Sequence, residues 1–182
     1  MRLGADADRI HRAGGEVIAI SSDDEVRQAG MFARWPTPHV QYVSDPDGAT
    51  YLRPLELFSP EERGGIGLPG LLIIDPDGDV VYRYVGRDFA DRTTDEAALT
   101  ALERLSLSPI DPTEGGPVLD VPDDLERFFA PRDLVPYFKG NRFGAVAIGG
   151  RLPESDADGR AVAREHRLMC EATLAAWEQL TT

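Results

Sequence analysis

Two short apolar runs constrain the fold more strongly than any other feature of the sequence. Residues 16–21 read EVIAIS and residues 70–75 read GLLIID. Successive side chains of a β-strand point to opposite faces of the sheet, so a run without polar alternation predicts a strand buried on both faces. Strands of this kind lie in sheets that helices cover on both sides. The sequence therefore favours the α/β class.

The second run is expected to continue into a hairpin. Asp75-Pro76-Asp77-Gly78 has the composition of a tight turn, and residues 79–86 alternate in the manner of a strand near a sheet edge. A further strand is predicted at 40–44, directly before a second DPDG sequence at 45–48. Four helices are expected from apolar spacing and capping residues: 4–13, a helix capped by Ser22 or Asp23, 49–57, and 95–105 capped by Thr94.

The composition changes at Ser106. Residues 106–124 hold four prolines and two glycines, which is typical of a linker or strap and not of a packed element. Apolar patches then alternate with polar residues, and a long amphipathic helix is predicted from 160 to 180. We expect three parts: an α/β domain over 1–105, a Pro/Gly-rich strap over 106–124, and a helical extension over 125–182.

The charge of the chain excludes several kinds of partner. With 32 acidic and 19 basic residues, the net charge is -13. Such a surface repels phosphate backbones and anionic lipids, so neither nucleic acid nor a membrane is expected as a partner. No apolar run approaches the roughly 20 residues that a membrane-spanning helix needs, and the first residues lack the apolar core of a signal peptide. The single cysteine, Cys170, allows no intrachain disulfide, so a cytoplasmic location is expected.

Two motifs could indicate a bound cofactor or metal, but neither has the sequence context that such a site requires. Residues 65–70 match G-x-G-x-x-G, but they precede a predicted strand and contain Pro69, whereas a dinucleotide site needs this pattern to open a helix. Asp75, Asp77 and Asp79 alternate as in an EF-hand, but the sixth position is Val80 and not glycine. We therefore expect no cofactor and no metal site.

Cys170 lies one helical turn after His166, so the two side chains can share a helix face. A Cys–His pair can generate a nucleophilic thiolate. However, Cys170 also adjoins the apolar stripe of the predicted last helix, and a lone cysteine in this position is typically a small core residue. We interpret Cys170 as a core residue.

Three segments, taken in order, resemble a known family. They are 13–21 (AGGEVIAIS), 43–48 (VSDPDG) and 67–82 (GLPGLLIIDPDGDVVY). Together they are similar to thioredoxin-like redoxins of the alkyl hydroperoxide reductase / thiol-specific antioxidant family, the peroxiredoxin-like proteins. Residues 134–143 also resemble an extension found on some of these proteins.

The resemblance implies a central thioredoxin-like sheet with flanking helices. From the residues alone, the Leu68–Pro69 bond is expected to be trans. The resemblance implies instead that Pro69 is the cis-proline that faces the redox groove, with Leu68 beside it. It also implies an antioxidant oxidoreductase that reduces small peroxides or exchanges with a protein dithiol.

The chain departs from this family at the point that matters for catalysis. The family's reactive cysteine follows the first central strand, where a helix N-terminus lowers the thiol pKa. The strand, the loop and the cysteine have no counterpart here, and Cys170 lies far downstream of that position. No catalytic residue is assigned, and the chain as written is expected to be inactive.

The same departure leaves the expected sheet incomplete. In a thioredoxin sheet the missing strand lies between the strands that match 16–21 and 70–75, so both would carry unpaired edges facing a gap. One hypothesis is a truncated chain with a wrongly chosen start codon, which a mass spectrum of the native protein beginning at Met1 would refute. A second is that another segment, such as 143–148 or a partner chain, fills the gap.

Two functions therefore remain open. One is a redoxin whose family activity this chain cannot carry out unaided. The alternative is a non-catalytic redoxin-like module that binds a partner or forms a homodimer through residues 154–180, where Trp177 and Leu180 would contribute to the interface.

Overall fold

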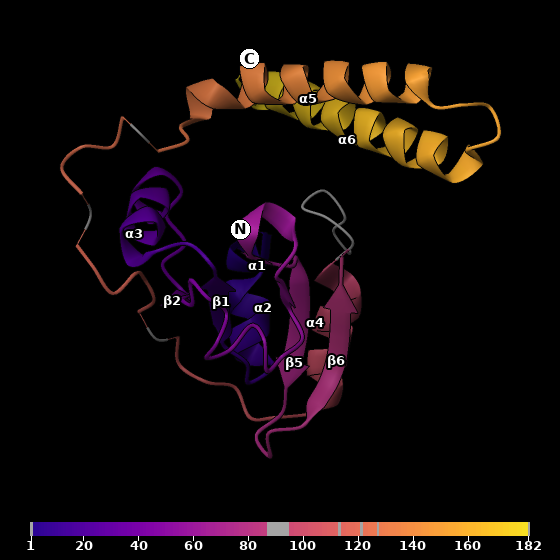
Figure 1. Cartoon of the computed structure of the whole chain (residues 1–182). Helices are drawn as coiled ribbons and strands as arrows, with labels where there is room; N and C mark the ends of the chain where they lie inside the picture. Colours follow the sequence, from indigo (N-terminus) through magenta and orange to yellow (C-terminus); the bar gives the residue numbers. More distant parts are fainter. Residues whose placement is uncertain (1, 87–94, 113, 121, 127, 182) are drawn as a thin grey trace. The chain divides into compact units, whose positions relative to one another are not determined.

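The computed structural model describes residues 2–86, 95–112, 114–120, 122–126 and 128–181 (Figure 1). The chain divides into an N-terminal unit, Met1–Phe128, and a C-terminal unit, Phe129–Thr182.

The N-terminal unit contains a β-α-β crossover built from β1 (Val17–Ser21), α3 (Glu25–Arg34) and β2 (Val40–Ser44). The two strands pair in parallel from Val17↔Val40 to Ser21↔Ser44, as the crossover helix requires. Gln28 joins the helix to the strand ends, since its Nε2 donates to the Val43 carbonyl at 2.8 Å and to Ser21 Oγ at 3.2 Å.

Helix α3 is capped by Asp24, whose carboxylate accepts the Arg27 N–H at 2.8 Å. The prediction of Ser22 or Asp23 as the cap is therefore wrong. Ser22 is used elsewhere, because its hydroxyl accepts the N–H of Gly67. Asp23 contributes its carbonyl, which accepts the hydroxyl of Ser44.

The helix expected over 49–57 does not form; the segment is a series of turns. The buried Asp45 carboxylate accepts the backbone N–H groups of Thr50, Tyr51 and Leu52 at 2.8–3.2 Å. The other backbone bonds of the segment differ from those of an α-helix, because Pro54 has no N–H and the Leu57 N–H donates to the Leu52 carbonyl, five residues back. Short elements follow: β3 (Phe58–Ser59), the 3₁₀ helix η1 (Glu62–Gly64) and β4 (Ile66–Gly67), with β3 and β4 antiparallel.

The predicted hairpin is confirmed as β5 (Gly70–Ile74) and β6 (Val80–Val85), paired antiparallel. Asp75 Oδ1 closes the turn by accepting the N–H groups of Asp77 and Asp79 at 3.0 and 2.9 Å. Gly78 has φ +93°, a conformation that glycine adopts without steric cost. The DPDG sequence thus makes the turn that its composition predicts.

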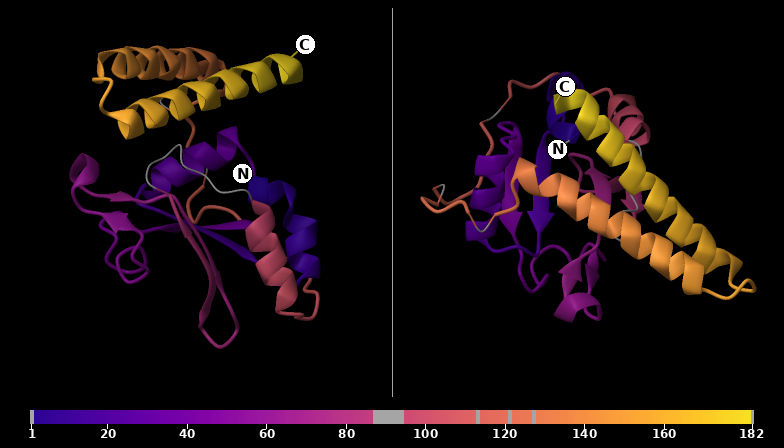
Figure 2. Two further views of the ribbon diagram at one scale, coloured as in Figure 1. Left: turned by 90° about the vertical axis from the view of Figure 1, so that its right-hand side faces the viewer. Right: turned by 90° about the horizontal axis from the view of Figure 1, so that it is seen from above.

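The N-terminal helix expected over 4–13 is two short helices, α1 (Arg2–Ala5) and α2 (Ala7–Arg12). Helix α4 (Asp95–Arg104) contacts β5, β6 and α2, and Figure 2 shows α2 and α4 side by side. Arg9 joins these helices by ion pairs to Glu96 at 2.7 Å and Glu103 at 2.6 Å. The expected cap Thr94 lies outside the described residues.

The described strands form three separate two-stranded sheets, β1–β2, β3–β4 and β5–β6. The mixed α/β class is confirmed, but the continuous thioredoxin-like sheet implied by the resemblance is not seen. Within the described residues β1 and β5 do not pair directly. They do not pair through 143–148 either, because that segment is helical. Those two ways of filling the gap are therefore excluded.

The Pro/Gly-rich segment after α4 lies against the N-terminal unit. Ile110 N–H donates to the His11 carbonyl, Gly115 N–H donates to Pro38, and Gly116 accepts the N–H of Tyr42. These backbone bonds favour the description of a strap over that of a free linker.

The C-terminal unit is a helical hairpin of α5 (Pro131–Arg151) and α6 (Ala157–Thr181). The expected helical extension is confirmed, whereas the apolar segment 143–148 belongs to α5 and is not a strand. Small residues allow the helices to approach, since a Cβ placed on Gly149 would lie 3.3 Å from that of Ala163. Among the described residues, no helix combines the length and the apolar character needed to cross a membrane.

Candidate functional site: an apolar cavity between two strand edges

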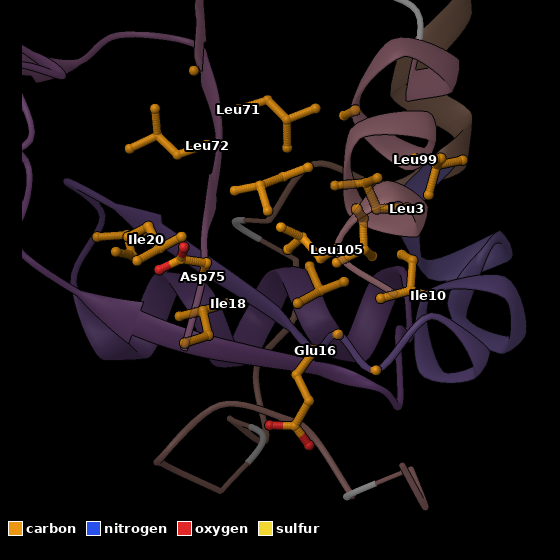
Figure 3. Close-up of a pocket in the computed structure, with 18 of the residues that line it drawn as sticks. Leu3, Ile10, Glu16, Ile18, Ile20, Leu71, Leu72, Asp75, Leu99 and Leu105 are labelled. Carbon is orange, nitrogen blue, oxygen red and sulfur yellow. The ribbon is translucent and has the colours of Figure 1, made fainter. Parts of the chain in front are cut away.

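A cavity of about 770 Å³ lies in the N-terminal unit between β1 and β5 (Figure 3). Most of its lining is leucine and isoleucine. Helices α2 and α4 contribute Ile10, Leu99 and Leu102, while the turns after β2 and the strap contribute others: Leu52, Leu55, Leu57, Leu107 and Ile110. The cavity is therefore built from segments spread over most of the N-terminal unit.

The edges of both strands, and not only one face, border this cavity. All five residues of β5 line it, as do Val17, Ile18 and Ile20 of β1. Because neighbouring side chains of a strand point to opposite faces, a consecutive run of lining residues means that the strand edge itself meets the cavity. In Figure 3, Leu71 and Leu72 project from opposite sides of β5.

The charged residues of the lining are all acidic: Glu16, Asp75 and Asp111. Figure 3 shows the Glu16 carboxylate directed away from the labelled leucines and isoleucines. The Asp75 carboxylate accepts the two backbone bonds of the hairpin turn. The described lining contains no serine, threonine, cysteine, histidine, lysine, arginine or tyrosine. The aliphatic lining suits an apolar ligand.

The two residues assigned to a groove by the resemblance, Leu68 and Pro69, lie at the start of β5. Leu68 lines the cavity, and its N–H donates to the Leu57 carbonyl at 2.8 Å. The Pro69 carbonyl accepts the Gly86 N–H at 2.7 Å, which fixes the proline at the beginning of the hairpin. The expected cis bond is wrong: Leu68–Pro69 is trans, the form that X–Pro bonds favour by about 0.5–1 kcal/mol.

Cys170 is confirmed as a core residue. Its side chain in α6 is fully buried, and this burial raises the pKa of the thiol. The neighbouring His166 places Nε2 3.4 Å from Asn141 Oδ1 of α5. A buried thiol with a raised pKa has little thiolate character, so these residues are arranged for packing.

Several residues of the cavity could not be assigned to it from the sequence. Leu52, Leu55 and Leu57 lie in the segment predicted to be a helix, which the structure shows as a series of turns. A different signal was available, because leucines that persist through a polar segment indicate a loop covering the core. Outside the cavity lining, His11 is buried and in edge-to-face contact with His39, at 5.3 Å between ring centres.

Within the described residues, no group of three or more His, Cys, Asp or Glu side chains is placed to hold a metal ion. Comparison of the chain with protein-family models, with curated proteins and with solved structures finds no match.

Proposed function

We propose that this chain is a non-catalytic, redoxin-like binding module whose ligand occupies the apolar cavity between β1 and β5. The observation that carries the proposal is the cavity of about 770 Å³, bordered by two strand edges and lined almost wholly by aliphatic side chains. Concave apolar sites of this size are the usual form of ligand pockets in proteins.

The order of elements supports the redoxin-like part of the proposal. A parallel β-α-β crossover, an antiparallel hairpin and a following helix occur in the sequence that the resemblance implies. A continuous sheet of that type would require one more strand between β1 and β5. The single cysteine also supports a reducing compartment, and we propose the cytoplasm as the location.

A probe that is neutral and apolar tests the binding proposal. N-phenyl-1-naphthylamine gains fluorescence when it leaves water, so titration with the protein should give a saturable rise. Ile18 lines the cavity but is 61% exposed, so Ile18→Asp places a charge at the site with little cost to folding. We expect Ile18→Asp to weaken binding about tenfold or more, as for one charge left in an apolar site.

Val81→Asp on β6 is the matched control. Val81 is 42% exposed and does not line the cavity. This variant should bind the dye as the wild type does. Equal loss of binding in both variants, or a titration that does not saturate, would count against a ligand site between β1 and β5.

Thiol-dependent reduction of a peroxide or of a protein disulfide remains the competing proposal. It needs an accessible thiolate, and the one cysteine has a buried thiol with a raised pKa. The two proposals are distinguished by the turnover of hydrogen peroxide with dithiothreitol, measured for the wild type and for Cys170→Ala. We expect no protein-dependent turnover in either; activity that disappears in Cys170→Ala would show that Cys170 is a redox site.

A homodimer is a second candidate, favoured by exposed apolar residues on the C-terminal unit. Phe143 and Val146 lie three positions apart on α5, where residues share a face, and are 62% and 52% exposed. Val162, Leu168 and Leu180 of α6 are exposed as well, within or beside the predicted segment 154–180. Sedimentation velocity should show a dimer for the wild type and a monomer for Phe143→Glu.

A further inference from the structure

We propose that the ligand of the cavity is a β-strand from a partner protein: an extended segment, apolar on both faces and flanked by basic residues, that pairs with β1 and β5 together. This inference rests on the proposed function and specifies its ligand. The inserted strand would join the β1–β2 and β5–β6 sheets into one.

The backbone hydrogen-bonding groups on the cavity edges of β1 and β5 favour a peptide ligand over a lipid or another hydrocarbon. In each two-stranded sheet, alternate residues direct their N–H and C=O groups away from the paired strand. No described strand pairs with the cavity edge of β1 or of β5. A hydrocarbon in the cavity would cover these backbone groups without bonding them, which is costly, whereas a strand would bond both edges.

The size of the cavity fits one short strand. A strand rises about 3.3 Å per residue, neighbouring strands lie about 4.8 Å apart, and the layer is about 10 Å thick, so five residues fill about 800 Å³. The cavity measures about 770 Å³, and β5 is five residues long. The cavity is therefore large enough for a single strand of the same length as β5.

The lining specifies the side chains of the segment. Leu71 and Leu72 project to opposite sides of β5, so both faces of an adjacent strand would meet apolar side chains (Figure 3). The charged groups of the lining, Glu16, Asp75 and Asp111, are acidic, and the chain carries a net charge of -13. A segment with basic residues at its two ends is complementary to this charge.

The same observations disfavour strands of this chain as the occupant. Residues 143–148, the apolar segment expected to be able to fill the gap, are part of α5. Among the described strands, none other than β2 pairs with β1 and none other than β6 pairs with β5. A second copy would bring the same net negative charge, so a basic partner is the better match.

The probe is a synthetic peptide, acetyl-Lys-Lys-Val-Ile-Val-Ile-Val-Lys-Lys-amide, labelled with tetramethylrhodamine and followed by fluorescence anisotropy. Two further peptides carry N-methyl groups on alternate residues of the apolar core, one on the odd and one on the even positions. Each keeps every side chain and charge but loses the N–H donors along one edge. If the strand pairs with β1 and β5 together, each methylated peptide should bind about tenfold or more weakly.

Variants of the protein locate the binding site of the peptide. Ile18→Asp, within the cavity, should weaken binding, while Val81→Asp on β6 should not. If Val81→Asp alone weakens binding, the peptide adds to the outer edge of β6 and the inference is wrong. If only one methylated peptide is weakened, the segment pairs with a single edge and does not join the sheets. If the fraction of bound peptide falls at protein concentrations at which the chain dimerises, the occupant is a second copy.

The naphthylamine dye separates this inference from the proposed function. If the dye binds in an Ile18-dependent manner and the peptide does not compete with it, the cavity is a ligand site but its ligand is not a strand. If both methylated peptides bind as tightly as the parent, the segment is held by apolar contacts without strand pairing. If neither dye nor peptide binds, the proposed function itself fails.

Discussion

Asp45 organises the turns that follow β2 and thereby the loop that covers one side of the cavity. Burial of its carboxylate acts to raise the pKa, but the N–H groups of Leu52, Tyr51 and Thr50 together hold the pKa below its usual range. A group with a lowered native pKa stabilises the fold above its unfolded pKa of about 3.9, and this contribution is lost as the pH falls through the native pKa.

We therefore expect Asp45→Asn to lower the free energy of unfolding at pH 7. Its amide group turns a donor toward N–H groups that need an acceptor. The gap between wild type and variant should shrink as the pH falls from about 5 toward 2, because the wild-type carboxylate becomes protonated. Urea unfolding over this pH range measures the difference in the free energy of unfolding between the wild type and Asp45→Asn. Asp77→Asn, at an exposed position of the second DPDG turn, removes the same charge and should leave the acid dependence almost unchanged; an equal response of both variants would assign the effect to net charge.

Helix α3 contains Gly30 where the ring of Phe128 packs directly on the helix backbone. A Cβ at Gly30 would overlap that ring, so Gly30→Ala should lower the free energy of unfolding by about 1–3 kcal/mol, although alanine is the better helix former. Gly140 of α5 has nothing within 4 Å of such a Cβ, and Gly140→Ala should stabilise by about 0.5–1 kcal/mol.

A double-mutant cycle isolates the cause of the Gly30 effect. Phe128→Ala removes the ring, so the cost of Gly30→Ala should disappear in that background. If the cost persists when the ring is absent, the overlap is not its origin. Thermal unfolding followed by circular dichroism gives all four values.

At this scale the sequence predicts best those elements that local chemistry determines. β1, β5 and β6 follow from unbroken apolar runs and from a DPDG turn, which act within a few residues. The helix prediction for 49–57 was wrong because Pro54 has no N–H to donate, and the Leu57 N–H donates to Leu52, five residues back and not four. The prediction that 143–148 could form a strand was wrong because an apolar run alone does not distinguish a strand from a helix. The four-residue spacing of Ala145 and Gly149, which lets α6 approach, was the missed signal.

For the candidate site, the resemblance implies unpaired edges on both strands but not what surrounds them. The resemblance placed a missing strand between 16–21 and 70–75, and the cavity lies between these strands. Leu3, Leu107 and Ile110 join its lining from the two ends of the N-terminal unit. No local pattern reports such long-range contacts, so these residues could not be found without the structure.

The chain carries a net charge of -13. Because of this charge, the proposed homodimer and the proposed complex with a basic peptide should respond to salt in opposite ways. Two copies of this chain repel each other at long range, and this repulsion is screened as the Debye length falls from about 10 Å at 0.1 M to about 3 Å at 1 M. A dimer formed through Phe143 and its apolar neighbours should therefore strengthen, about several-fold, between about 0.05 and 0.5 M sodium chloride. Binding of the lysine-flanked peptide should weaken over the same range, because its attraction to the acidic surface is screened.

Sedimentation velocity measures the dimer and fluorescence anisotropy measures peptide binding, in matched buffers. Phe143→Glu is the control, since it should remove dimerisation and leave peptide binding intact. A dimer that weakens with salt would mean that ion pairs, and not the apolar residues of α5, hold the two copies together.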